Sequence, residues 1–401
     1  MFNAVLKKKK QQEYKIKELY QKMEITTSDV NLSEKSVAIT VGSRGINCIV
    51  DVISLVVSFL KNRGALPFIV PAMGSHGGNT EKGKKDILSS LGITEQSINA
   101  PIKANVETSK TGNAKGIPVF CLKTVLSADA VVIINRIKGH TDFSGDIGSG
   151  LIKMAAVGLG GEAGARRVHL EGYSALCNSI KKIGLEQLNN LPILFGIGLL
   201  EDYNNNLYYA EVIKPGNFLQ REKILFEKAK KLHLSLPVDD IDVLLIENFG
   251  KNICGTGMDP SVTGRYPSGY CTNPSIQRIV VLRLTPQSHG NASGIGMADI
   301  TTAKFYESID FGTFYKNIVT CGGFLSGKIP VVMPNDRQAI GVAIDSFPNK
   351  NITIIKIKNT SLLEKIQISA TLKDRVSKKN YYVYDKPVFI QFDKLENIKE
   401  E

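Results

Sequence analysis

The chain has 401 residues, of which 43% are hydrophobic and 22% are charged, and its formal net charge is +12 at pH 7. This composition is typical of a soluble globular protein long enough for two domains, each with its own core. No apolar run approaches the roughly 18 residues that a membrane-spanning helix needs. The six cysteines include no C-x-x-C pair, which argues against a zinc ribbon or a disulfide framework.

The positive charge is interpreted as solvated surface, without a nucleic-acid partner. Part of it is concentrated in Lys7–Lys10, and other lysines are scattered over predicted helices. The aromatic residues that single-strand binders interleave with a basic stripe are not evident. The apolar segment ahead of Lys7 is too short for a secretory signal. We therefore expect reduced thiols and a cytoplasmic protein that has no membrane partner.

The N-terminal half alternates strands, glycine-rich loops and helices. Residues 1–36 are polar and lysine-rich, and we expect an arm or a peripheral hairpin there. Beyond them, the pattern predicts strands at 37–41, 67–70 and 131–134 and helices at 46–63 and 80–91, the latter capped by Thr80. This order predicts a mostly parallel sheet whose loops gather at its C-terminal edge.

The second half repeats the pattern after a plausible boundary at LSLPVDD, residues 234–240. Strands are expected at 192–200 and 207–213 and a helix at 218–234 before this boundary, strands at 243–246 and 279–284 after it, and short strands in the tail at 352–393. The predicted fold class is therefore α/β, with two α/β domains (1–235 and 236–401) and the active site in the cleft between them.

The residues with the clearest chemical meaning fall between positions 131 and 169. A buried strand leads into a glycine-interrupted loop that carries His140, and a helix-length segment then places Lys153 among apolar residues. A second glycine cluster, 158–164, precedes His169. Glycine lets a backbone turn sharply and approach a ligand closely.

Taken singly, each candidate has a structural explanation. His76 and His140 could be loop histidines bonded to backbone carbonyls, although two such loops at one sheet edge can face a single ligand. Lys153 could pack its stem on apolar neighbours, or its amine could be a nucleophile or a covalent anchor. His169 could be a surface residue or a metal ligand. Arg44 could pair with an acid or bind a carboxylate or phosphate in bidentate fashion.

Two nucleotide-binding motifs are incomplete. Gly158, Gly160 and Gly164 contain one residue too many for a dinucleotide fingerprint and follow a predicted helix instead of a strand. The segment 322–328, GGFLSGK, resembles a P-loop, but Ile329 stands where the magnesium-binding Ser or Thr is needed. Chance explains both better than nucleotide binding does.

Taken together, one set of residues resembles, in order and approximate spacing, the functional residues of the lactate racemase family. Members of this family are nickel-pincer-nucleotide-dependent racemases and epimerases of 2-hydroxy acids. The resemblance covers most of the chain, and the set consists of Arg44, His76, His140, Lys153 and His169.

The resemblance implies a role for each member of this set. Lys153 would carry the nickel-pincer nucleotide covalently through a thioamide, and His169 would be the protein ligand of nickel. His76 and His140 would be the paired acid/base residues, and Arg44 would hold the substrate carboxylate. The implied partners are a small 2-hydroxy acid and the cofactor-maturation proteins.

The sequence also departs from the lactate-specific members. They carry an acidic residue three positions before the arginine, where this chain has Val41, and a different loop replaces their YPLDQ-type segment near residue 250. The substrate therefore stays open among 2-hydroxy acids, as does the oligomeric state. Gly158 and Gly160 are further candidates for cofactor binding. Candidates for a different substrate-facing wall are Lys251, Asp259, Arg265 and His289.

Two other readings of the same residues remain. Lys153 could be the Schiff-base lysine of a lyase or aldolase, with His140 as its proton carrier. Alternatively, the chain could be a non-catalytic nucleotide- or metal-binding protein whose histidines are structural.

Overall fold

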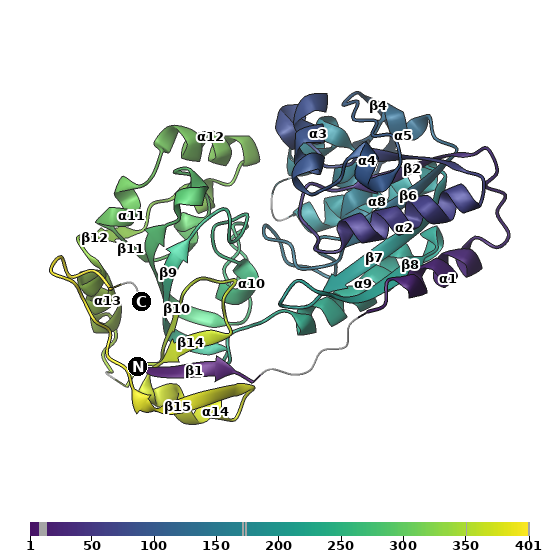
Figure 1. Ribbon diagram of the computed structural model, residues 1–401. Coiled ribbons are helices and arrows are strands. Elements are labelled where there is room, and N and C mark those ends of the chain that lie inside the picture. Colours follow the sequence, from purple (N-terminus) through teal and green to yellow (C-terminus); the bar gives the residue numbers. More distant parts are fainter. Residues whose placement is uncertain (8–13, 171, 173–174, 350, 400–401) are drawn as a thin grey trace. The chain divides into compact units, whose positions relative to one another are not determined.

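The computed structural model describes residues 1–7, 14–170, 172, 175–349 and 351–399, without the side chains of 320 and 321 (Figure 1). The chain divides into two compact units. The N-terminal unit comprises Gln11–His140 and Ser144–His233, and the C-terminal unit comprises Leu234–Glu401 with Met1–Lys10 and Thr141–Phe143. Most of the predicted basic run Lys7–Lys10 lies outside the described residues.

The N-terminal unit is built on a five-stranded sheet in the order β3-β2-β6-β7-β8. β8 runs antiparallel to β7, and the other strands are parallel. β4 and β5 form a separate antiparallel hairpin. The strands are β2 (Ser36–Val41), β3 (Leu66–Pro71), β4 (Thr108–Ala114), β5 (Ile117–Leu122), β6 (Ala130–Arg136), β7 (Ile193–Glu201) and β8 (Leu207–Ile213).

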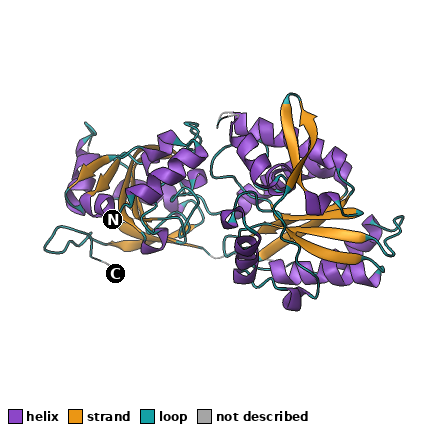
Figure 2. Cartoon of the chain, turned by 90° about the horizontal axis from the view of Figure 1, so that it is seen from above, coloured by secondary structure: helices purple, strands orange, loops and turns teal. Residues whose placement is uncertain are grey.

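Helices cover both faces of this sheet (Figure 2). They are α1 (Lys17–Thr26), α2 (Ile49–Asn62), η1 (Gly77–Asn79), α3 (Glu81–Ser90), α4 (Glu95–Ile98), α5 (Lys123–Leu126), α6 (Leu151–Lys153), η2 (Met154–Gly158), α7 (Gly161–Leu170), α8 (Leu176–Asn190), η4 (Pro215–Asn217) and α9 (Phe218–Leu232). In α2, Ile49, Val52, Ile53 and Val56 recur at helical spacing and are buried, so one face of the helix joins the core.

The order of the strands reverses between β2 and β6. The chain passes from β2 to β3 on one side and later enters β6 on the other side of β2. In open α/β sheets such a reversal leaves a crevice beyond the carboxyl ends of the two strands, where ligands bind. The loops after β2 and β6 therefore flank the position at which this unit is best suited to hold a ligand.

The C-terminal unit contains an eight-stranded sheet in the order β12-β11-β10-β9-β13-β14-β1-β15. β12 to β13 in this order are parallel, and β14, β1 and β15 follow in antiparallel pairs. The strands are β1 (Phe2–Leu6), β9 (Asp240–Phe249), β10 (Ser275–Leu284), β11 (Ile300–Thr302), β12 (Val331–Met333), β13 (Ile354–Ile357), β14 (Lys365–Ile368) and β15 (Tyr381–Pro387).

Buried side chains on both faces of this sheet form two hydrophobic clusters. The helices of the unit are α10 (Pro260–Thr263), η5 (Pro286–Ser288), η6 (Ile295–Met297), α11 (Ala303–Glu307), α12 (Phe311–Cys321), η7 (Phe324–Gly327), α13 (Asp336–Asp345), η8 (Ala370–Leu372) and α14 (Lys373–Ser377). Here the strand order reverses between β9 and β13, so this sheet has a second switch point.

The predicted strands and helices of the first unit are confirmed with small shifts at their ends. The Thr80 cap is also present, since its Oγ1 accepts a hydrogen bond of 3.0 Å from the backbone of Gly83. The expectation for residues 1–36 was wrong, because α1 forms there and β1 pairs with β14 and β15. Residues 1–7 accordingly belong to the C-terminal unit and not to a domain spanning 1–235.

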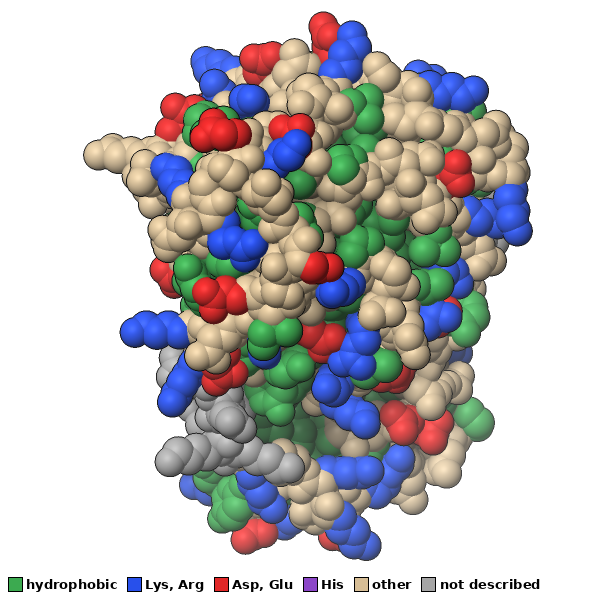
Figure 3. Space-filling model, turned by 90° about the vertical axis from the view of Figure 1, so that its right-hand side faces the viewer, with side chains coloured by type: hydrophobic (Ala, Val, Ile, Leu, Met, Phe, Trp, Pro, Cys, Tyr) green, Lys and Arg blue, Asp and Glu red, His purple; other side chains and the backbone are tan. Residues whose placement is uncertain are grey.

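The charged surface residues and the cysteines can be compared with the expectations of solvated surface charge and reduced thiols. On the face in Figure 3, lysines and arginines are interspersed with acidic side chains. None of the cysteines whose side chains the structure describes forms a disulfide; these are Cys48, Cys121, Cys177, Cys254 and Cys271. Among the described helices, none combines the length and apolarity needed to cross a membrane.

Candidate active site

Three of the predicted residues lie at the carboxyl ends of neighbouring parallel strands. Arg44 follows β2, His76 follows β3, and His140 follows β6, in a sheet ordered β3-β2-β6. Arg44 and His140 therefore stand on the two sides of the switch point. The predicted gathering of these loops at one sheet edge follows from the parallel order of the strands.

Lys153 and His169 come from the helices after this edge. Lys153 is half-buried at the end of α6, and His169 is exposed in the last turn of α7. The two helices are joined through η2, a turn of π-helix. Turns of π-helix are rare in proteins as a whole, but those that occur are often found at functional sites. They interrupt the regular hydrogen-bond ladder of an α-helix.

The pKa of His140 is affected by the charges of most of these residues. Burial is the largest cause of a pKa that lies well below the ordinary value for histidine. The positive groups that add to this lowering are, in descending order, Lys153, His169, Lys138 and Arg44. Their joint influence on one imidazole means that these side chains gather around it.

His76 belongs to the same cluster. Although part of its side chain is exposed, desolvation by surrounding protein lowers the pKa of His76 to about 4. Positive charges lower it further, and they belong, in descending order, to Arg44, Lys153 and Lys84. Lys153 thus acts on both strand-end histidines, and Arg44, Lys153 and His169 all lie within electrostatic reach of His140.

Both histidines are consequently neutral at neutral pH. A lowered pKa means that the imidazole releases its proton below the ordinary value of 6.5, and the neutral ring can then accept a proton. A bound anion would reverse part of this shift, because its negative charge favours the protonated ring. The site as it stands is rich in positive charge and suited to an anionic ligand.

The two candidate cofactor-binding glycines are packed tightly against protein atoms. A Cβ on Gly158 would lie 2.4 Å from Met154 Sδ and 2.7 Å from the carbonyl oxygen of Ala72. A Cβ on Gly160 would lie 2.7 Å from the carbonyl oxygen of Ala156. These glycines allow η2 and α7 to approach their neighbours closely, and their contact with a cofactor remains a prediction.

The sequence reasoning missed Lys84 in α3. Its side chain is completely buried, and Nζ has no hydrogen-bond partner among the described residues. Burial lowers the pKa of Lys84, and the charge of Glu162 on α7 opposes that effect. The sequence did indicate that Lys84 is buried. Lys84 stands four residues before the buried Leu88 and therefore lies on the inward face of the helix.

The loop around His76 is held to α3 and α7. Gly77 lies directly against the backbone at Gly83, where an added Cβ would come within 2.6 Å of its carbonyl carbon. Asn79 Nδ2 donates a 2.6 Å hydrogen bond to Glu162 Oε2. These contacts connect the segment that follows His76 with the helix that carries His169.

The candidates for a substrate-facing wall lie in the C-terminal unit and are mostly engaged in structure. Lys251 Nζ donates to the carbonyl oxygen of Gly255 at 2.6 Å and to Asn317 Oδ1 at 3.1 Å. Asp259 caps α10. Arg265 pairs with Asp299 at 2.8 Å and also donates to backbone carbonyls.

His289 is exposed and adopts the left-handed conformation, with φ 47°, at the end of η5. A role for His289 or Lys251 in substrate binding remains a prediction.

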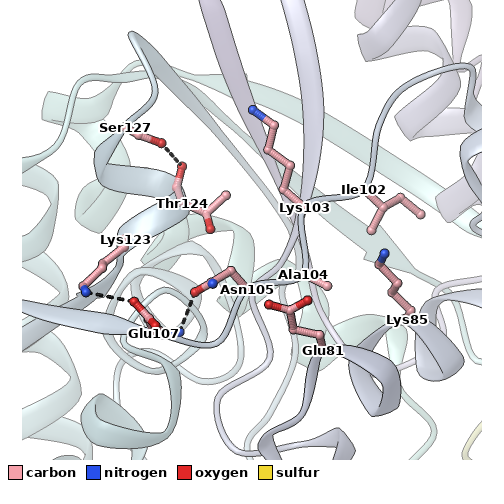
Figure 4. Close-up of a pocket in the computed structure, with 10 residues that line it drawn as sticks. All are labelled: Glu81, Lys85, Ile102, Lys103, Ala104, Asn105, Glu107, Lys123, Thr124 and Ser127. Carbon is pink, nitrogen blue, oxygen red and sulfur yellow. Dashed lines mark hydrogen bonds and ion pairs between the residues drawn. The ribbon is translucent and has the colours of Figure 1, made fainter.

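An open depression elsewhere on the N-terminal unit is distinct from this cluster. It has a volume of about 550 Å³ and lies beside α3 and α5. Lys85 and Lys103 contribute positive charge there, whereas Lys123 is paired with Glu107 at 2.8 Å (Figure 4). None of the predicted site residues lines it.

Comparison with known proteins adds a structural likeness. No family model matches the sequence, and no curated protein sequence does. The fold is similar to that of the lactate racemase apoprotein from Thermoanaerobacterium thermosaccharolyticum, with a TM-score of 0.58 and 12% identity over 90% of this chain and 99% of that chain. A protein from Thermotoga maritima is also similar, with a TM-score of 0.48 and 14% identity over 79% of this chain and 84% of that one. The chain therefore has a lactate racemase-like α/β fold.

Proposed function

We propose that this chain is a racemase or epimerase of a 2-hydroxy acid and that it works with a nickel-pincer nucleotide held through Lys153. The observation that carries the proposal is the convergence of Lys153, His169 and Arg44 on the imidazole of His140. An amine, a second imidazole and a guanidinium around one neutral base are the groups that this reaction requires. The lactate racemase-like fold is consistent with the proposal.

The donor set suits such a cofactor. Lys153 offers a primary amine for covalent attachment, and His169 offers an imidazole, which is a common ligand of nickel. Within the described part of the chain, no three His, Cys, Asp or Glu side chains group as ligands of a metal ion. A metal that arrives with ligands of its own needs only one donor from the protein. When bound, the nickel-pincer nucleotide supplies an acceptor for the α-hydrogen of the substrate as hydride.

The protein's own residues then bind the substrate and move protons. Arg44 binds the carboxylate of the 2-hydroxy acid through its planar fork of donors. His76 and His140 are neutral, so each can take the hydroxyl proton of one isomer and return a proton when the other isomer reacts. The negative charge of the bound carboxylate raises the pKa of both imidazoles towards the working pH.

A direct assay tests the proposed reaction. Protein co-expressed with the cofactor-maturation proteins is given single isomers of a panel of 2-hydroxy acids, and product handedness is followed by chiral chromatography. We expect inversion of at least one acid by the parent and by His289→Ala, and its loss in His140→Ala. Nickel-loaded protein that inverts no acid across aliphatic, dicarboxylic and sugar acids would contradict the proposal.

The proposed metal ligand can be tested separately. His169→Ala should remove nickel from the matured protein and leave the mass added at Lys153, because attachment and metal ligation use different side chains. Elemental analysis and peptide mass spectrometry measure the two quantities. His289→Ala, which changes a histidine in the C-terminal unit, serves as the control and should keep its nickel. Unchanged nickel in His169→Ala would rule out the assignment.

A Schiff-base enzyme is the second candidate. A half-buried amine next to two imidazoles also suits a lysine that condenses with a carbonyl substrate. Borohydride added with 2-keto acids or aldehydes would trap such an adduct on Lys153 without any nickel. On the proposed racemase function, no trapping is expected.

A further inference from the structure

Glu222 is a fully buried carboxylate in the N-terminal unit, and nothing in the proposed chemistry uses it. It extends from α9 to the first turn of α6, where Oε2 accepts a 2.9 Å hydrogen bond from the backbone N–H of Ile152. The backbone N–H of Leu151 also lowers the pKa of this carboxyl, whereas Oε1 has no hydrogen-bond partner among the described residues. A backbone donor at the start of the helix is thus satisfied by a side chain from elsewhere in the chain.

Gly150 makes this contact possible. A Cβ at that position would lie 2.4 Å from Glu222 Oε1 and 2.5 Å from its carboxyl carbon, so any other residue would displace the carboxylate. The carbonyl oxygen of Gly150 accepts a 2.8 Å hydrogen bond from Asn135 Nδ2 at the end of β6. On the other side, Gly184 of α8 lies against the carbonyl oxygen of Ile152. Three elements therefore fix the turn that ends at Lys153.

The charge of Glu222 is balanced by these backbone donors alone. Burial raises the pKa of Glu222 to about 7, and the N–H groups of Ile152 and Leu151 oppose the rise. No charged side chain contributes. Lys181 of α8 and Lys223 of α9 both pair with Asp146, at 2.8 and 2.7 Å. The turn that Glu222 contacts ends at Lys153.

We infer that Glu222 is a positioning residue for Lys153: it fixes the first turn of α6 and so sets where the Lys153 amine is presented. The inference rests on the proposed function, in which that amine anchors the cofactor. Hydrogen bonds to an ionised carboxylate are stronger than those to a neutral one. Because desolvation outweighs this gain and raises the pKa of Glu222, the closed turn is favoured when Glu222 is protonated, and ionisation of Glu222 increases the exposure of the amine.

The test uses the full chain without cofactor or substrate. The protein is acetylated briefly with N-hydroxysuccinimidyl acetate at a series of values between about pH 5.5 and about pH 9. Peptide mass spectrometry gives the labelling of Lys153 relative to that of Lys85, an exposed lysine that corrects for the reagent. The parent, Glu222→Gln and Glu227→Gln are compared. Glu227 is the matched control, because it lies exposed on the same helix and pairs with Lys230.

In the parent and in Glu227→Gln, the labelling ratio should rise about fivefold as the pH rises through about 7, because opening of the turn rehydrates the ionised carboxylate, whose burial raises its pKa. In Glu222→Gln this step should be absent. A parent-like step in Glu222→Gln would overturn the inference.

Amide hydrogen exchange of the parent gives a second measurement that needs no variant. The protection of Ile152 should fall across the same pH interval relative to that of Ala155 in η2. Constant protection would also count against Glu222.

Neither readout depends on activity. Suppose that the chain inverts no 2-hydroxy acid, but the pH step in labelling is present in the parent and absent from Glu222→Gln. The positioning role of Glu222 then stands and the proposed function fails. If the chain inverts a 2-hydroxy acid but the parent shows no pH step in labelling, the proposed function stands and the positioning role of Glu222 fails.

Discussion

The two sheets of this protein share a parallel core, a reversal of strand order and glycine-rich loops at the carboxyl edge, yet the two edges differ in their chemistry. In the N-terminal unit, the loops after β3 and β6 carry His76 and His140, whose pKa values are lowered by desolvation and by nearby positive groups. In the C-terminal unit, the loops after β9 and β13 are bonded to each other across the reversal. The backbone of Asp259 donates to Thr360 Oγ1 at 2.9 Å, and Glu247 pairs with Lys358 at 2.9 Å.

This difference shows that a glycine-rich loop at a switch point is not by itself a sign of an active site. Lys251 donates to a backbone carbonyl and an amide oxygen, which are ordinary structural partners. His140 instead has a pKa well below the ordinary value, because of desolvation and of positive groups led by Lys153 and His169. Strong perturbation of pKa, combined with convergence of several elements, distinguishes the two edges.

The largest effect should come from the lysines of the two edges. Lys153→Met should abolish racemase activity in matured protein, because it removes the amine that anchors the cofactor. Lys251→Met should retain activity of the same order and instead loosen the loop after β9. Initial rates with one accepted 2-hydroxy acid measure both. Equal losses of activity in Lys153→Met and Lys251→Met would contradict the assignment of the active site to the N-terminal edge.

The histidines give the next largest effect. His76→Ala and His140→Ala should each lower the rate about 10²–10⁴-fold in both directions, since each full inversion needs one acid and one base. His289→Ala, in the C-terminal unit, should change the rate far less. The assay follows either isomer of the same acid. Parent-like racemisation by both single variants would make these histidines structural and the mechanism wrong.

Glu222 should also make the stability of the fold decrease as the pH rises. Its pKa in the folded chain is raised from 4.5 to about 7, so its contribution is fully present below about 4.5 and is lost as the pH rises through about 7. The loss amounts to about 3 kcal/mol. Urea unfolding of the parent minus that of Glu222→Gln should show this decline, whereas the difference between the parent and Glu227→Gln should be flat.

The smallest effect should come from Lys84. Lys84→Met should raise the pKa of His76, because one of the positive charges that lower it is removed; the rise is modest, since burial, Arg44 and Lys153 contribute more. Lys85→Met changes the same charge on the exposed side of α3 and should leave His76 unaffected. Nuclear magnetic resonance titration of the His76 ring measures both. If the two variants shift His76 alike, Lys84 does not act on the site.

The sequence predicted the strands of the five-stranded N-terminal sheet and the edge at which the candidate residues lie. Val131–Ile134 is a continuous apolar run, and the helix after β2 has clear 3.6-residue spacing, so local patterns predicted both elements. Because parallel strands end at the same edge, the loops with Arg44, His76 and His140 could be expected to meet. The match to a family's order of residues then added Lys153 and His169.

The parts that could not be predicted depend on contacts between distant segments. β1 is short and pairs with β14 and β15, which lie more than 350 residues away in sequence, so its place in the C-terminal sheet had no local signal. Glu222 meets Ile152 across a separation of 70 residues and looks like any other acid in an amphipathic helix. The candidate wall in the C-terminal unit was inferred from loop composition alone, which does not reveal that Asp259 is a helix cap.

The most direct test of the account is the mass of the matured protein. The chain is purified from a host that makes the nickel-pincer nucleotide, and its intact mass and a peptide map are recorded, with Lys153→Met and Lys251→Met treated identically. The account predicts one added mass, located on the peptide that contains Lys153, present in Lys251→Met and absent from Lys153→Met. An unmodified parent from a host in which a control racemase is loaded, or an adduct on another lysine, would contradict it.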